Sequence, residues 1–190
     1  MTAPAKFVGR SVPRLEDRPL LTGQGRFAAD ISFPGQWTMR VVRSSVAHGK
    51  IKSIDASAAL ALPGVHAAWT AADVAQLPPI PFRLTGLKTL EPYRQPVLAK
   101  DVVRYVGEPV AVVFAENAYL AEDAADLVEV VVEQRRATLL ATEQPDSFDK
   151  VLSTEAGFIR KGYGDVDASF RAAHAVVALE LSIGRHSGVP

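Results

Sequence analysis

The pattern of hydrophobic and polar positions predicts two similar units in the middle of the chain. Residues 37–44 and 50–54 alternate between apolar and polar side chains, which is typical of strands that are buried on one face. Asp55 then provides an N-terminal cap for a short helix that ends at Leu62, and residues 65–69 form the next strand. The first unit is therefore predicted to be β-α-β.

The second unit has the same order of elements. Residues 102–105 and the run 110–115 are predicted strands, and the latter is apolar on both faces, as in a strand buried on both sides. Asn117 caps a helix with one apolar stripe, and residues 130–132 form the closing strand. The stripe consists of Leu120, Ala124, Leu127 and Val128. Two crossover units predict an α+β fold in which helices pack against a mixed sheet.

The flanking regions follow other patterns. Residues 1–35 are predicted to form an extended arm, because Pro and Gly interrupt them and periodicity is weak. Residues 77–95 are rich in proline and are predicted to be a long surface loop. A short helix is expected over 165–170, and a strand with one apolar face over 175–183. A terminal strand of this kind needs cover, which we expect from a second body.

Composition narrows the class of protein. The 190 residues include 21 basic and 21 acidic side chains, and this balance argues against a nucleic-acid partner. The lack of Cys excludes disulfides, thiolate zinc sites and iron–sulfur ligation by this chain. No apolar run reaches the roughly 18 residues that a membrane span needs, and no signal peptide is visible. We therefore expect a soluble, cytoplasmic domain without membrane contact.

Candidate catalytic residues do not converge in the sequence. Residues 23–28 match G-x-G-x-x-A, but they lack the preceding strand and following helix that a dinucleotide site needs, so a turn is favoured. His186 and Ser187 are adjacent in an extended segment and point in opposite directions, which disfavours a Ser–His pair. The four histidines lack metal-ligand spacing, and Asp165 and Asp167 are interpreted as first-turn caps rather than metal ligands.

Glu108 lies between Gly107 and Pro109 and has two interpretations. The favoured one is a turn residue whose carboxylate accepts backbone amides, and the alternative is a buried acid.

Short stretches along nearly the whole chain carry a family resemblance. They are Val8-Gly9-Arg10, Arg14-Leu15-Glu16-Asp17, Leu21-Thr22-Gly23-Gln24-Gly25-Arg26-Phe27, Asp30-Ile31, Arg43-Ser44, Ala47-His48-Gly49-Lys50-Ile51, Pro63-Gly64-Val65, Tyr105-Val106-Gly107-Glu108-Pro109-Val110-Ala111, Leu120-Ala121-Glu122-Asp123-Ala124-Ala125, Gly164-Asp165-Val166-Asp167, Arg185-His186-Ser187 and Val189-Pro190. In this order they resemble the N-terminal part of the molybdopterin-binding large subunit of the xanthine dehydrogenase/aldehyde oxidase/carbon monoxide dehydrogenase family. Residues 133–136 depart from the family pattern, which has an acidic-aromatic strand end there.

The resemblance implies the α/β hammerhead fold over residues 36–145. Residues 146–190 would then be a linker, a short helix and a strand that lead toward a molybdenum-cofactor domain. In this family that larger domain binds molybdopterin, while [2Fe-2S] clusters and FAD lie on other subunits or domains. The chain is thus expected to bind no cofactor by itself and to be a structural, non-catalytic part of a molybdenum hydroxylase that helps shape the substrate channel.

The expected partners are the molybdenum-cofactor domain or subunit and the iron–sulfur and FAD subunits. The expected contact surfaces are the 77–95 loop, the turn at Gly107, Glu108 and Pro109, and the 183–190 tail with Arg185, His186 and Ser187. An alternative is an independent binding module with the hammerhead fold that holds a small molecule or a protein in the proline-rich loop. A stand-alone enzyme has little support, because no acid, base and electrophile converge.

Overall fold

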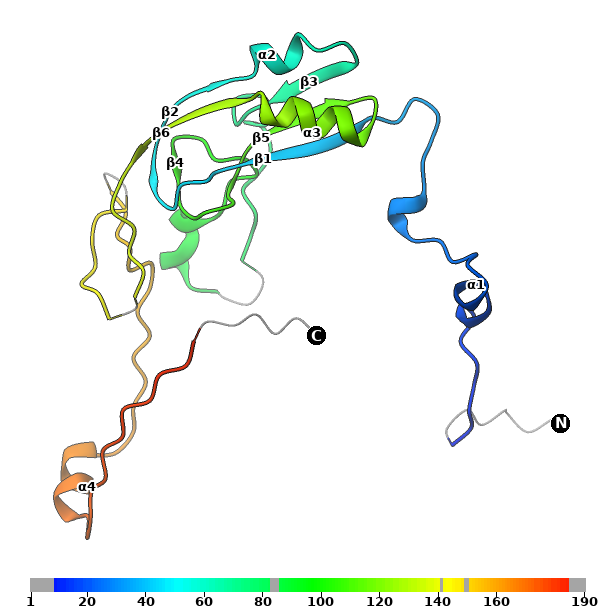
Figure 1. The fold of residues 1–190 in the computed structure, drawn as a ribbon. Coiled ribbons are helices and arrows are strands. Elements are labelled where there is room, and N and C mark those ends of the chain that lie inside the picture. Colours follow the sequence, from blue (N-terminus) through cyan, green and yellow to red (C-terminus); the bar gives the residue numbers. More distant parts are fainter. Residues whose placement is uncertain (1–8, 83–85, 141, 149–150, 185–190) are drawn as a thin grey trace.

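The chain folds around two three-stranded antiparallel sheets. The computed structural model describes residues 9–82, 86–140, 142–148 and 151–184. Sheet A has the strand order β1-β5-β3, and sheet B has the order β4-β2-β6 (Figure 1). The strands are β1 (Thr38–Arg43), β2 (Gly49–Asp55), β3 (Val65–Trp69), β4 (Val102–Val103), β5 (Pro109–Ala115) and β6 (Glu129–Gln134).

Short helices connect and flank these strands. They are α1 (Asp17–Leu21), α2 (Ser57–Leu60), α3 (Ala118–Asp126) and α4 (Val166–Ala172), with 3-10 turns η1 (Ala28–Asp30) and η2 (Lys88–Tyr93). Among the residues that the structure describes, none of the helices has the length and apolar character needed to span a bilayer.

The main hydrophobic core lies between sheet A and helices α2 and α3. The side chain of Asn117 accepts a hydrogen bond from the Leu120 amide at 2.9 Å and begins α3 as the sequence predicts. The apolar stripe of α3 then packs on the central strand β5. The buried members of this core are Ala59, Ala111, Val113, Ala124 and Val128. Small side chains on both surfaces let the helix approach the strand closely.

A second core lies where the two sheets meet. Val103 of β4 and Val110 of β5 are fully buried there with Ala99, and Ile51 and Val132 of sheet B pack against them. Strand β5 thus contributes alternate side chains to both cores, which explains why its sequence is apolar on both faces.

Gly49 allows β6 to approach β2 closely. A Cβ atom at this position would lie 2.5 Å from Cγ1 of Val132 and 2.6 Å from the carbonyl oxygen of Glu133. The ladder continues through Glu133 and Gln134, which pair with Lys50 and Gly49. Glu133 and Gln134 begin the stretch that departs from the family pattern, and they still form the end of β6.

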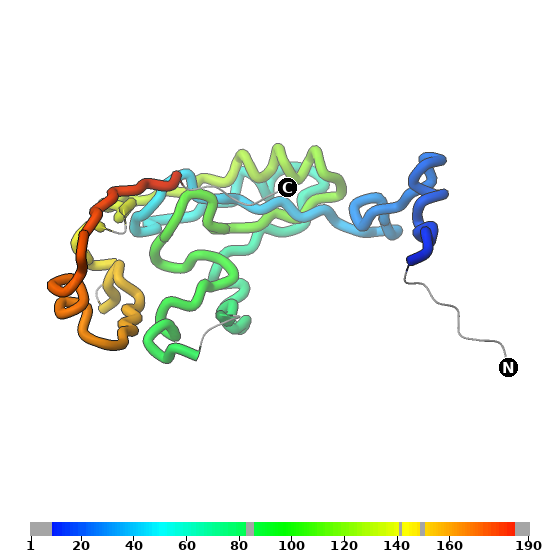
Figure 2. Tube along the Cα trace, turned by 90° about the horizontal axis from the view of Figure 1, so that it is seen from below, coloured from blue at the N-terminus to red at the C-terminus, as the bar shows by residue number. Residues whose placement is uncertain are grey.

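The N-terminal segment and α4 lie away from the sheets, and the segment after α4 runs back toward them (Figure 2). The N-terminal segment leaves at one end of the molecule and α4 lies beyond the other end (Figure 2). The described part of the predicted arm contains the five-residue helix α1 and the 3-10 turn η1, and the described part of the predicted 77–95 loop contains η2. Residues 175–184 are all exposed, and none of these described residues is in a strand. No described strand supplies ladder hydrogen bonds to this segment, so the strand over 175–183, which we expect a second body to cover, stays a prediction.

The α+β class and the order of the elements are confirmed, but the predicted single mixed sheet is corrected. Strands β2 and β3 belong to different sheets, as do β5 and β6, and every pairing is antiparallel. Only residues 56–64 separate β2 from β3, which is shorter than the dozen or so residues that a parallel crossover needs. Each connection instead carries the chain from one sheet to the other.

We expect Gly49→Ala to lower the free energy of unfolding by about 1–3 kcal/mol, because the new methyl group overlaps backbone of β6. Gly162→Ala is the matched control, since a Cβ there meets nothing within 4 Å, and a surface change of this kind stays within about 0.5 kcal/mol. Urea denaturation followed by circular dichroism measures both. Equal stabilities of the two variants would contradict the close approach.

Candidate functional site

The turn at Gly107, Glu108 and Pro109 places a carboxylate in the interior. Gly107 has a φ of +88°, in the left-handed region that glycine adopts without strain. This conformation reverses the chain between β4 and β5 and directs the next side chain inward. Glu108 is 1% exposed and is one of the largest fully buried side chains of the described chain.

Arg104 surrounds the Glu108 carboxylate with donors. Its Nε atom donates to Oε1 at 2.7 Å, its Nη2 atom donates to the same oxygen, and its backbone amide donates to Oε2. The Arg104 side chain is itself only 18% exposed. Because a buried charge is tolerated only when it is paired and hydrogen-bonded, this arrangement is what permits Glu108 in the interior.

Both interpretations of Glu108 prove correct in part. The residue is a buried acid, and its carboxylate also accepts a backbone amide within the turn. Both carboxylate oxygens are engaged by Arg104, so the group is a structural element. Arg104 as the partner of Glu108 was not predicted from the sequence. Opposite charges four residues apart commonly form ion pairs on helices. Arg104 and Glu108 have this spacing, but they lie in the turn between β4 and β5 and not on a helix.

The backbone of the same turn joins three segments of the chain. The Ser44 amide donates to the Glu108 carbonyl at 2.9 Å, and the Gly107 amide donates to the Ser44 carbonyl at 2.7 Å. The Arg43 guanidinium donates to the Gly107 carbonyl, and the Ala99 amide donates to the Pro109 carbonyl, both at 2.8 Å. The turn is therefore the junction between β1, β5 and the segment that precedes β4.

A hollow of about 430 Å³ adjoins this junction. His48 lies on its wall and is buried, with Nδ1 3.0 Å from the Arg136 carbonyl oxygen and Nε2 3.2 Å from that of Phe148. The imidazole stacks on the Phe148 ring at a centroid distance of 5.4 Å. Tyr93, at the end of η2, donates from its hydroxyl group to the Ser153 carbonyl at 2.8 Å. The hollow is thus formed where the proline-rich loop meets the segment after β6.

Glu143 fixes the turn on the far side of this hollow. The amides of Leu140 and Leu139 donate to its carboxylate at 2.9 and 3.0 Å, and Arg136 pairs with it at 2.9 Å. These donors, the amides first, hold the pKa of Glu143 below its ordinary value. The carboxylate therefore stabilises the loop in its charged form.

Of the six predicted contact residues, only three can be placed. Gly107, Glu108 and Pro109 lie at the junction, and Pro109 is the first residue of β5. Arg185, His186 and Ser187 lie outside the described residues. A role for any of the six in contacting a partner stays a prediction.

The other candidate motifs have local structural roles. Residues 23–28 follow helix α1 instead of a strand and lead into η1, with Gly23 at a φ of +70°, as a turn requires. The Asp165 carboxylate accepts the Ala168 amide at 2.8 Å, which confirms it as the cap of α4. Within the described ranges, no three His, Asp or Glu side chains come together in a way that would hold a metal ion.

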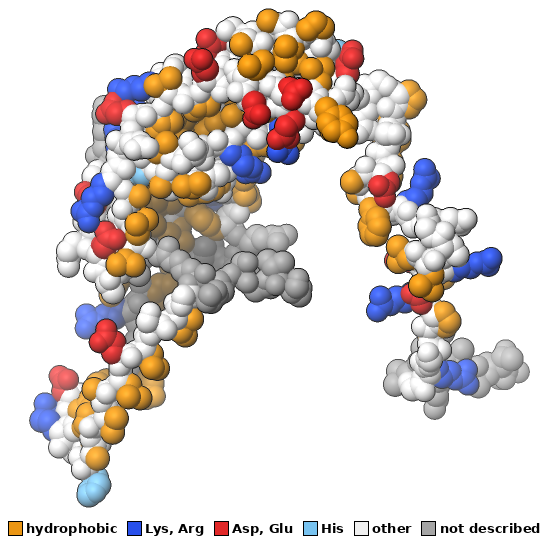
Figure 3. All heavy atoms as spheres, in the orientation of Figure 1, with side chains coloured by type: hydrophobic (Ala, Val, Ile, Leu, Met, Phe, Trp, Pro, Cys, Tyr) orange, Lys and Arg blue, Asp and Glu red, His pale blue; other side chains and the backbone are white. Residues whose placement is uncertain are grey.

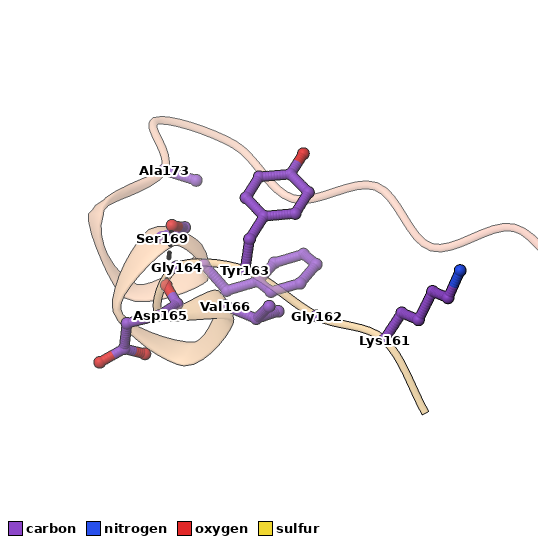
Figure 4. A pocket seen from close by; sticks show the side chains of 9 residues that line it. Lys161, Gly162, Tyr163, Gly164, Asp165, Val166, Ser169 and Ala173 are labelled. Carbon is purple, nitrogen blue, oxygen red and sulfur yellow. Dashed lines mark hydrogen bonds between the residues drawn. The ribbon is translucent and has the colours of Figure 1, made fainter. Parts of the chain in front are cut away.

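A larger hollow, of about 760 Å³, lies beside α4 (Figure 4). All of its lining residues belong to the single segment 161–173, so it is the concave side of one short helix and its lead-in. Tyr163, Val166 and Phe170 line it, and their side chains are 98%, 59% and 59% exposed. We interpret it as an uncovered apolar surface, because an enclosed ligand site needs walls from more than one segment.

Fold and site together define a class of protein: an α+β domain with two antiparallel sheets and a buried Arg104–Glu108 pair at their junction. The family model for the aldehyde oxidase and xanthine dehydrogenase a/b hammerhead domain matches residues 22–136. The chain belongs to this family, and the predicted hammerhead fold is confirmed.

Individual relatives agree with this assignment. The nicotine 6-hydroxylase large subunit of Paenarthrobacter nicotinovorans is 42% identical over 96% of the chain and 23% of its own length. The 6-hydroxypseudooxynicotine dehydrogenase complex subunit gamma of the same organism is 40% identical over 97% of the chain and 24% of its own length. A crystal structure of Cu,Mo-CO dehydrogenase matches 67% of the chain and 15% of its own with a TM-score of 0.57 at 38% identity. The chain spans about a quarter of the length of the curated relatives it matches.

We expect Arg104→Met to lower the free energy of unfolding by about 3–5 kcal/mol, because it leaves the Glu108 carboxylate buried without its partner. Adding Glu108→Leu to this variant should restore part of the loss, since no uncompensated charge then remains.

The matched control is Arg40→Met, which breaks the exposed pair with Glu122 and should cost less than about 1 kcal/mol. Thermal and urea denaturation of all four proteins provide the comparison. An Arg104→Met variant as stable as Arg40→Met would show that the buried pair is not needed.

Proposed function

We propose that this chain is a structural, non-catalytic part of a molybdenum hydroxylase large subunit. It packs on the molybdopterin-binding body of that subunit and helps shape the channel through which substrate reaches the metal. The family membership supports this proposal, as do relatives about four times as long as the chain.

One observation carries the proposal: the described part after β6 exposes apolar side chains in a row. Figure 3 shows hydrophobic side chains over α4 and the segment that follows it. Residues 175–184 lie alongside no other strand, and their odd-numbered apolar side chains are 80–89% exposed. These are Val177, Leu179, Leu181 and Ile183. An exposed apolar row of this length marks a surface that another protein body covers.

The chain divides into three parts in this proposal. Residues 1–35 are an arm, residues 36–145 are the hammerhead domain, and residues 146–190 are a linker, a short helix and a strand. In the last part, the apolar row completes its backbone hydrogen bonds on a sheet of the larger body, which is the usual way in which an isolated extended segment is stabilised.

The chemistry takes place outside this chain. The Glu108 carboxylate at the junction is engaged by Arg104, and in this proposal the described residues support the fold while the reaction belongs to the larger body. Molybdopterin bound to the larger body would supply the molybdenum for the redox chemistry. The sequence contains no Cys, so [2Fe-2S] clusters belong to other subunits or domains, and we place FAD there as well. A cytoplasmic location is part of the same proposal.

A chimeric enzyme tests the proposed function. The matching segment of the nicotine 6-hydroxylase large subunit is replaced by residues 1–190, and the subunit is produced with the rest of its enzyme. We expect a soluble complex that retains molybdenum and reduces a dye with nicotine, whereas deletion of the segment abolishes both. A soluble large subunit that contains the chain but assembles no molybdenum-loaded complex would refute the proposal.

The apolar row provides the matched pair of variants. Leu179→Asp with Leu181→Asp places two charges on the covered side and should abolish assembly of the chimera. Ala178→Asp with Ser182→Asp places the same charges on the other side and should leave more of it intact. Equal losses in the two double variants would mean that the sidedness of the segment is irrelevant.

A further inference from the structure

Helices cover only one face of sheet A. Arg40 pairs directly with Val113 across the β1–β5 ladder, and its guanidinium contacts Glu122 of α3 at 2.7 Å. Side chains of directly opposed residues project to the same face of a sheet. Arg40 and Val113 therefore mark the face beneath α3, and their neighbours along each strand mark the opposite face.

Part of the opposite face is aromatic and exposed, although Val110 and Val112 of β5 on the same face are buried. Met39 is paired with Phe114, and Trp69 is paired with Val112, next to Phe114 on the same face. The Trp69 and Phe114 rings meet edge to face at a centroid distance of 4.7 Å. Met39 remains 53% exposed and Trp69 45% exposed, although the other face of the sheet packs against α2 and α3.

A second aromatic pair lies at the margin of this face. Trp37 precedes β1 and stacks on His66 of β3 at a centroid distance of 4.2 Å, with an angle of 12° between the rings. The Glu116 carboxylate lies 3.9 Å from His66 and is 64% exposed. Both tryptophans of the chain thus belong to one surface, here named the aromatic face, which consists of Trp37, Met39, His66, Trp69 and Phe114.

We propose that the aromatic face is a second docking surface for the same molybdopterin-binding body that the apolar row contacts. This inference rests on the proposed function. Aromatic side chains and Met are enriched at the buried centres of protein interfaces. We therefore expect a partner surface that is apolar in its middle. Because the Glu116 carboxylate lies at the margin, this surface should carry a Lys or Arg opposite it.

The length of the relatives supports the molybdopterin-binding body as the partner that covers this face. Sheet A and the segment after α4 are separate parts of the described chain, and each exposes apolar side chains. A single partner must be large to cover both, and the relatives have about three quarters of their length outside the region they share with this chain. A second copy of the chain is the competing occupant, and the experiment below distinguishes the two.

Hydroxyl-radical footprinting with mass spectrometry measures the cover directly. The 190-residue chain and the chimeric enzyme are oxidised in parallel, and the rates at Met39 and Trp69 are compared. Tyr119 is the internal control, because it lies on α3 and is 85% exposed. We expect the rates at Met39 and Trp69 to fall about fivefold or more in the chimera, as at the dry centre of an interface, and the rate at Tyr119 to fall less.

The outcomes separate this inference from the proposed function. Protection of Leu179 and Leu181 without protection of Met39 and Trp69 would overturn the aromatic face as a docking surface and leave the proposed function standing. If neither the aromatic face nor the apolar row is protected, the result counts against this inference and against the proposed function. Protection of Met39 and Trp69 in the isolated chain that increases with its concentration would assign the face to a second copy and overturn the inference.

A charge reversal adds a second test within the chimera. Glu116→Lys places a cation opposite the basic group that we expect on the partner, and should lower the thermal midpoint of the assembled enzyme. Asp123→Lys makes the same change on exposed α3 and should lower it less. Equal effects of the two variants would contradict the placement of a cation opposite Glu116.

Discussion

The structure depends on one ion pair that is buried where its two sheets meet. Glu108 is fully buried, and Arg104 supplies two side-chain donors and one backbone donor to its carboxylate. The same few residues separate β4 of sheet B from β5 of sheet A. Because the pair cannot be separated without leaving a charge in the interior, it holds the turn in one conformation and keeps the two sheets in register with each other. The hydrogen bonds from Ser44 and Arg43 then attach β1 to the same point.

Local features of the sequence were enough to predict most elements, because each element depends on its own residues. Asn117 caps α3 and Asp165 caps α4 as expected, and the doubly apolar run 110–115 is the central strand of the core. The pairing of strands was not predictable in this way, since it depends on contacts between distant segments. The sequence order suggested one mixed sheet, and the structure has two antiparallel sheets. The 175–183 segment has the pattern of a strand but lacks a neighbour to pair with.

The candidate site shows the same division between local and distant information. The turn at Gly107–Pro109 was evident from its residues, and Gly107 has the positive φ that such a turn needs. The stacking of His48 on Phe148 and the aromatic pairs on sheet A bring together residues that are far apart in the sequence. The aromatic face and the apolar row after α4 are among the apolar surfaces that remain exposed around this well-packed centre. A domain with a rigid centre and uncovered apolar surfaces has the physical character of a component of a larger assembly.

The central claim is that the apolar row becomes a strand of a larger body. Hydrogen–deuterium exchange of the backbone amides of residues 176–183 tests it most directly, because exchange reports whether each amide is hydrogen-bonded. In the isolated chain, where this segment has no neighbouring strand, these amides should exchange at the rate of an unstructured peptide. In the assembled chimeric enzyme these amides should exchange at no more than about one hundredth of that rate. Equally fast exchange in the assembled, molybdenum-loaded enzyme would contradict the account.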